Sequence, residues 1–142
     1  MSLPRMDRAA REFLLADSVF STAAGGPLRV TTGDDPPTVT TPWVEVWVAG
    51  NISLSGDGVA WSPLIQVNAC APKGYADAKT VVWDLASRAA WLLGRARNVV
   101  YLNAQYSGRL TDGPLTDVDT TRGESNPIVR AIVRAELRVQ TT

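Results

Sequence analysis

The chain has 142 residues, of which 45% are hydrophobic and 20% charged, a composition typical of a folded globular protein rather than a disordered segment. Lys plus Arg and Asp plus Glu both number 14, so the formal net charge is zero and the overall positive charge of many nucleic-acid-binding proteins is absent. The chain has no histidine, and Cys70 is its one cysteine, which excludes Ser-His-Asp and Cys-His catalytic groups, an internal disulfide and a cysteine-rich metal site.

The N-terminal half predicts one helix and one strand around a loop. Apolar residues at helical spacing predict a helix over 4–20, which the Gly25-Gly26-Pro27 run ends. Residues 31–42 contain consecutive prolines and are predicted to form a loop. Strict alternation predicts a strand over 43–49, with an aliphatic face (Val44, Val46, Val48) and an aromatic and polar face (Trp43, Glu45, Trp47).

The C-terminal half predicts further strands and the strongest helix of the chain. A strand over 60–71 is expected to pair antiparallel with the first, because their connection is short and rich in glycine. A helix follows over 75–94, then a strand over 98–106. Residues 109–124 are rich in aspartate and are predicted to be a surface loop or hairpin, with its acidic part at 112–124. The last strand, 128–140, alternates without a break.

These elements predict an α+β fold. We expect a mostly antiparallel sheet of about four or five strands, with an N-terminal helix and one long central helix packed on one face. The chain is expected to be a single domain over 1–142, with a loop at 31–42 and an inserted loop or hairpin at 109–127. No segment resembles a membrane-spanning helix or a signal peptide. The second face of the sheet is left without an element to cover it.

The residues of that second face are the candidate interaction residues. Arg130, Arg134 and Arg138 share one face of the last strand, which is either a solvated face or a strip that meets acidic groups of another protein. Trp43 and Trp47 are covered either by other parts of the chain or by a neighbouring subunit. We interpret these five residues as an interface. No catalytic, cofactor-binding or metal-binding residue is predicted: Cys70 is expected to be a buried, inert thiol, and Asp112, Asp117 and Asp119 lack the spacing of a calcium loop.

The chain resembles the tail terminator proteins of long-tailed, siphovirus-like bacteriophages. Residues 7–17, DRAAREFLLAD, are similar to the opening helix of that family. Residues 64–72, LIQVNACAP, followed by Ala76-Asp77-Ala78 and a long helix, resemble its central passage from strand to helix. The chain departs from the family at Asn68, where an acidic residue is more common.

This resemblance implies a structural protein of the virion and not an enzyme, with no cofactor. Such proteins form hexameric rings that cap the tail tube, end its polymerisation and provide the surface that joins the head. The implied partners are further copies of the chain, the major tail tube protein and a head-completion or connector protein. The genome would pass through the lumen without sequence-specific contacts, and no membrane would be involved. Trp43, Trp47, Arg130, Arg134 and Arg138 would then contact subunits or the tube, as residues 109–127 would.

The implied location is the head-proximal end of the tail, after assembly in the host cytoplasm. Two other functions remain open from the sequence. One is a head-closure or connector ring protein of the same tail system, and the other is an α+β module that binds a small molecule between sheet and helix.

Overall fold

The computed structural model of the chain describes residues 3–33, 40–54, 60–120 and 127–141. Its helices are α1 (Met6–Leu15), α2 (Ser18–Ala24) and α3 (Ala78–Arg95), with a 3₁₀ turn, η1, at Pro27–Arg29. Its strands are β1 (Val30–Thr31), β2 (Trp43–Leu54), β3 (Ala60–Pro72), β4 (Val99–Tyr101), β5 (Ala104–Asp119) and β6 (Ile128–Thr141). Within these ranges, no helix is long and apolar enough to cross a membrane.

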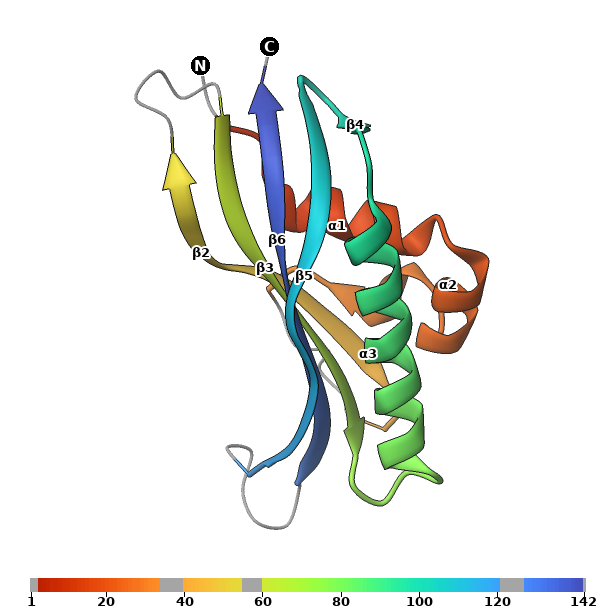
Figure 1. Cartoon of the computed structure of the whole chain (residues 1–142). Coiled ribbons are helices and arrows are strands. Elements are labelled where there is room, and N and C mark those ends of the chain that lie inside the picture. The colour runs from red at the N-terminus through yellow and green to blue at the C-terminus, as the bar shows by residue number, and fades with distance from the viewer. Residues whose placement is uncertain (1–2, 34–39, 55–59, 121–126, 142) are drawn as a thin grey trace.

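The strands form one curved sheet in the order β1-β2-β3-β6-β5-β4 (Figure 1). The short β1 pairs parallel to β2, and every other neighbouring pair is antiparallel. The α+β class and the antiparallel pairing of the first two long strands are therefore confirmed. The expected four or five strands are too few for the sheet seen here, because the strand predicted over 98–106 divides into β4 and the start of β5, and because β1 lies in a segment that was expected to be a loop.

The helices pack against the apolar face of the sheet. Alternate residues of β6 point into one core that also contains buried residues of α1, β2, β3 and α3. On the helix side, α3 buries one stripe of residues (Ala78, Val82, Leu85, Ala86, Ala89, Ala90, Leu93), while Val81 and Leu92, which the sequence pattern also places on this stripe, are partly buried. The predicted alternation of the last strand is confirmed, since Val129, Ala131, Val133, Ala135, Leu137 and Val139 are all buried in this core.

The N-terminal helix predicted over 4–20 is two helices rather than one. Asp17 lies between them and caps α2, because its carboxylate accepts a hydrogen bond from the backbone N–H of Phe20 at 2.9 Å. Arg88 of α3 donates two further hydrogen bonds to the same carboxylate, at 2.9 and 2.7 Å. Arg88 thereby joins α3 to the start of α2.

A glycine allows α3 to lie directly on β5. A Cβ atom at Gly108 would collide with the backbone carbonyl of Leu93, near the end of α3. The backbone N–H of Gly108 donates to Ala96 O at 2.9 Å, and Arg97 donates to Gly108 O at 2.8 Å. This close approach fixes β5 beside the helix.

Residues 109–127, which were expected to form an inserted loop or hairpin, contain the second half of β5. Residues 109–119 continue β5 as a strand that pairs with β6 as far as Asp119 opposite Ile128. Of the two forms expected for this region, the strand pairing is that of a hairpin, although 121–126 lie outside the described residues. Half of the loop expected at 31–42 lies outside them as well, because only 31–33 and 40–42 are described.

Candidate interaction surface

The face of the sheet opposite the helices, which we call the helix-free face, carries the candidate residues. It is built from alternate residues of β2, β3, β6 and the part of β5 beside β6, and no helix in the described part of the chain covers it (Figure 1). All five sequence-predicted residues lie on strands that contribute to this face. Their environments differ, however, and they form four groups, of which the half-exposed Trp47 is described last.

Trp43 belongs to the first group, which is buried. Its side chain is only 1% exposed and forms a small apolar cluster with Cys70 and Ile128. The Trp43 indole Nε1 also donates a hydrogen bond to Glu45 Oε1 at 3.2 Å. The expectation that Trp43 is available to a neighbouring subunit is therefore wrong for the chain as described, since the chain itself buries it. The expectation of a buried Cys70 is confirmed.

Arg134 belongs to a second group, whose charge is balanced within the sheet. It donates to Gln66 Oε1 on β3 at 2.9 Å and to Asp112 Oδ2 on β5 at 3.1 Å. Gln66 then donates to Asn68 Oδ1 at 2.9 Å, and Asn68 donates to Glu45 Oε2 at 3.5 Å. One continuous chain of polar contacts thus crosses β5, β6, β3 and β2.

Arg130 is held in the same way by the acidic part of β5. Its guanidinium donates two hydrogen bonds to Asp117, at 2.9 and 2.7 Å, and also lies 3.6 Å from Asp119 Oδ2. Hydrogen bonding to Asp117 raises the already high pKa of Arg130, so this arginine stays charged. The neighbouring Glu136, itself buried, accepts a hydrogen bond from Arg109 at 2.8 Å.

These contacts give the acidic residues a role that sequence reasoning missed. Asp112 and Asp117 were expected in a solvated loop, yet each lies on β5 directly opposite an arginine of β6. The clue in the sequence is the number of aspartates just before a strand with an arginine at every fourth position. Only the strand register shows that the two sets of charges meet.

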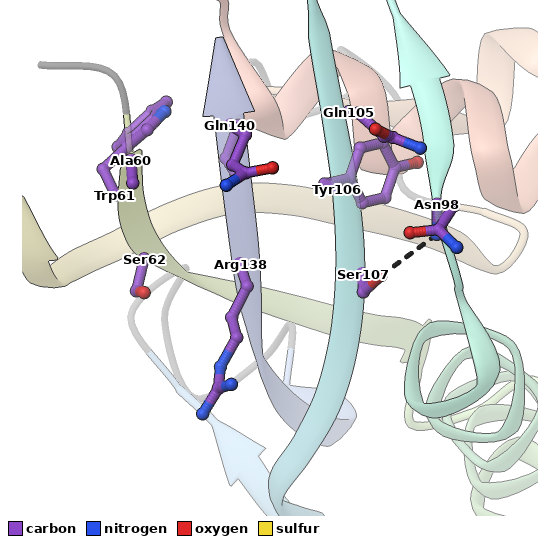
Figure 2. Close-up of a pocket in the computed structure, with 10 residues that line it drawn as sticks. Ala60, Trp61, Ser62, Asn98, Gln105, Tyr106, Ser107, Arg138 and Gln140 are labelled. Carbon is purple, nitrogen blue, oxygen red and sulfur yellow. Dashed lines mark hydrogen bonds between the residues drawn. The ribbon is translucent and has the colours of Figure 1, made fainter.

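Arg138 is different, because no described residue balances its charge. It is exposed, and its guanidinium makes no hydrogen bond or ion pair with any residue that the structure describes. It lines a hollow of about 650 Å³ at the end of the sheet where β3, β6 and β5 lie side by side. Figure 2 shows the Arg138 side chain beginning on β6 between Ser62 on β3 and Ser107 on β5, with its guanidinium below both serines in this view.

The rest of this hollow is lined by both polar and apolar residues. Gln105 and Gln140 are cross-strand neighbours on β5 and β6 and carry side-chain amides at its upper end in Figure 2. Ser107 Oγ accepts a hydrogen bond from the backbone N–H of Asn98 at 3.0 Å, which leaves its own hydroxyl hydrogen for another acceptor. The hollow therefore combines one positive charge with neutral hydrogen-bond donors.

Exposed tryptophans lie on both sides of the sheet. Trp47 of β2 is 47% exposed and borders a shallower hollow that also includes Arg134. On the outer surface of α3, Trp83 is 45% and Trp91 49% exposed. The guanidinium groups of Arg88 and Arg95 stack over the ring of Trp91, at 4.6 and 4.7 Å from its centre.

The side chains of this surface provide charges and hydrogen-bonding groups. Within the described ranges, no group of three or more His, Cys, Asp or Glu side chains is placed to hold a metal ion. Comparison with models of known protein families finds no family that matches the chain. A search of curated proteins likewise finds no relative.

Proposed function

We propose that this protein is a structural assembly protein of a long-tailed bacteriophage, a tail terminator that forms a hexameric ring on the tail tube. In this role it ends tube polymerisation and presents the surface that joins the head. Its partners are other copies of itself, the tube protein and a head-completion or connector protein. It acts without a cofactor, at the head-proximal end of the tail.

The observation that carries this proposal is the helix-free face. Arginine and aromatic side chains are enriched in the energetically important parts of protein interfaces. On this face the half-exposed Trp47 adjoins Arg134, and Arg138 lies on the same strand as Arg134. The resemblance of residues 7–17 and 64–72 to the terminator family adds independent support.

The polar contacts on this face also favour binding. A long arginine side chain that is free to rotate loses conformational entropy when a partner immobilises it. Arg130 and Arg134 are already held in place by acids of β5 and by Gln66. A partner that covers this face would therefore meet a surface whose side chains are largely ordered beforehand.

The test is a capping assay with the tube protein of the same tail system. Tubes are polymerised with and without the purified chain, and their lengths and ends are examined by electron microscopy. We expect shorter tubes with a ring at one end when the chain is present. Unchanged lengths and bare ends would contradict a terminator, and binding to the head connector without any effect on tubes would favour the connector-ring function.

A matched pair of variants connects this activity to the helix-free face. Trp47→Ala removes a half-exposed indole from that face, whereas Trp83→Ala removes one of similar exposure from the outer surface of α3. We expect Trp47→Ala to weaken capping and Trp83→Ala to leave it unchanged, with both variants folded by circular dichroism. If the two variants capped tubes equally well, the helix-free face would not be the surface responsible for capping.

A further inference from the structure

We propose that the hollow around Arg138 is a binding site for the carboxylate of an acidic segment of another protein. The proposal rests on the proposed function for the kind of partner that fills the site. Its chemistry, however, is argued from the hollow alone and can be tested without tubes.

The first argument is a contrast among the arginines of the helix-free face. Arg109, Arg130 and Arg134 each contact a carboxylate of the chain itself, on the neighbouring strand. Arg138 lies four residues after Arg134 on the same face of β6, but its cross-strand neighbour on β5 is Ser107, not an acid. Three of these four arginines therefore form an ion pair with a carboxylate of the chain, whereas Arg138 forms none with the described residues.

The second argument is the lining of the hollow. A carboxylate is a planar acceptor that binds an arginine through two parallel hydrogen bonds and takes further bonds from hydroxyl and amide donors. Arg138 supplies the charge for the carboxylate, and Ser107, Gln105 and Gln140 line the same hollow with hydroxyl and amide donors for other polar groups of the bound segment. A phosphate would be attracted as well, but the single unbalanced arginine suits the single charge of a carboxylate.

The third argument concerns the size and openness of the site. Sites for small molecules are usually enclosed, largely apolar clefts that bury most of the ligand. This hollow of about 650 Å³ is open, lies on a sheet surface, and has several polar side chains among its lining residues (Figure 2). A side chain that projects from a protein segment can reach Arg138 while the rest of the segment lies along the sheet, so we assign the site to a protein segment.

The test measures binding to the full chain by NMR, using the side-chain Nε–H signals of its arginines. The ligands are an acetylated tetraglutamate peptide, the matching tetraglutamine peptide and free glutarate. We expect the tetraglutamate peptide to shift the Arg138 signal and to bind at least about tenfold more tightly than the other two ligands. No shift at Arg138, or equal binding of the glutamine peptide, would overturn carboxylate recognition, and equal binding of glutarate would overturn the assignment to a protein segment.

Variants separate the site from general charge effects. Arg138→Gln removes the unbalanced charge, and Arg8→Gln removes an exposed arginine of α1 whose side chain makes no hydrogen bond or ion pair with the described residues. We expect Arg138→Gln to weaken tetraglutamate binding about tenfold and Arg8→Gln to leave it unchanged, both with wild-type melting temperatures. Equal weakening by the two variants would show attraction to overall charge only.

The capping assay distinguishes failure of this site from failure of the proposed function. If wild type caps tubes and Arg138→Gln caps them equally well, the carboxylate site has no part in assembly and this inference fails while the function stands. If the tetraglutamate peptide binds at Arg138 but wild type neither forms rings nor caps tubes, the site stands and the proposed function fails.

Discussion

The two faces of β6 show how one strand serves two purposes. The residues that face the helices are small or aliphatic and are buried in the main core, whereas those on the helix-free face include three arginines and a glutamate. On the first face, position is set by close packing, and any change in volume is felt. On the second face, ion pairs with the adjacent strand hold Arg130 and Arg134 in position, whereas Arg138 has no such partner among the described residues. We infer that the first face holds the fold together and that the second face recognises partners.

The largest loss of stability is expected from Gly108→Ala, at the point where α3 lies on β5. The new methyl group would collide with the Leu93 carbonyl, so helix and strand would have to separate. We expect a loss of more than about 4 kcal/mol in the free energy of unfolding, measured by urea denaturation. Gly74→Ala is the control, because a Cβ there meets nothing within 4 Å. A small effect at Gly108 would mean that α3 does not approach β5 this closely.

Leu85→Ala tests the packing of α3 on the helix-covered face. Leu85 is 1% exposed, so truncation leaves a cavity between helix and sheet. We expect unfolding free energy to fall by about 3 kcal/mol. Leu28→Ala, at a leucine that is 91% exposed, should change it by less than about 0.5 kcal/mol. Similar values for the two variants would contradict the position of α3.

The contact between Asp17 and Arg88 predicts a pH dependence. Hydrogen bonds from the Arg88 side chain and from the Phe20 N–H hold the pKa of Asp17 below its ordinary value. Because the folded pKa is the lower one, the contact stabilises the fold fully above the unfolded pKa of about 3.9 and loses its effect as pH falls through the folded value.

Asp17→Asn isolates this charge effect, since asparagine also caps helices well. We expect the variant to be less stable than wild type at pH 7 and the difference to shrink as the pH is lowered to about 3, measured by denaturant unfolding at each pH. Asp84→Asn, at an exposed position of α3, serves as the control. A difference that does not vary with pH would show that the charge of Asp17 has no part in stability.

The smallest losses of stability are expected on the helix-free face. Substitutions of two arginines of β6 should differ there in their effect on the free energy of unfolding. Arg134→Ala removes the donor to the buried Gln66 and the partner of Asp112, so we expect a loss of about 1 kcal/mol, limited by the exposure of the pair. Arg138→Ala should change the free energy of unfolding by less than about 0.5 kcal/mol, because its guanidinium makes no hydrogen bond or ion pair with a described residue. Thermal unfolding of both variants measures the difference, and a greater loss at Arg138 would show that it has a partner within the chain.

Local patterns in the sequence were sufficient for some elements but not for their contacts. The unbroken alternation of β6 and the apolar stripe of α3 predicted both elements and most of their buried residues, because each pattern has the period of its structure. The break at Asp17 also had a local signal, since an Asp-Ser pair is typical of a helix start, but the surrounding helical spacing masked it.

The contacts on the candidate surface depend on which residues of neighbouring strands lie opposite each other, and this register cannot be read from the sequence. Asp112 and Asp117 meet Arg134 and Arg130 only because β5 runs as a strand along β6, with two irregularities in its register near Pro114. The burial of Trp43 similarly depends on a contact with Ile128, which is 85 positions away in the chain. The face and its arginines were therefore predictable, whereas the balance of charges that singles out Arg138 was not.

The most direct test of the helix-free face as the assembly surface is a tryptophan footprint of the capped tube. Trp47 on that face and Trp83 and Trp91 on α3 are all nearly half exposed, so their indoles should react similarly with hydroxyl radicals in the free chain. Mass spectrometry then compares their oxidation before and after assembly. We predict strong protection of Trp47 and little change at Trp83 and Trp91, whereas protection of the α3 tryptophans with Trp47 still reactive would contradict the assignment of the helix-free face.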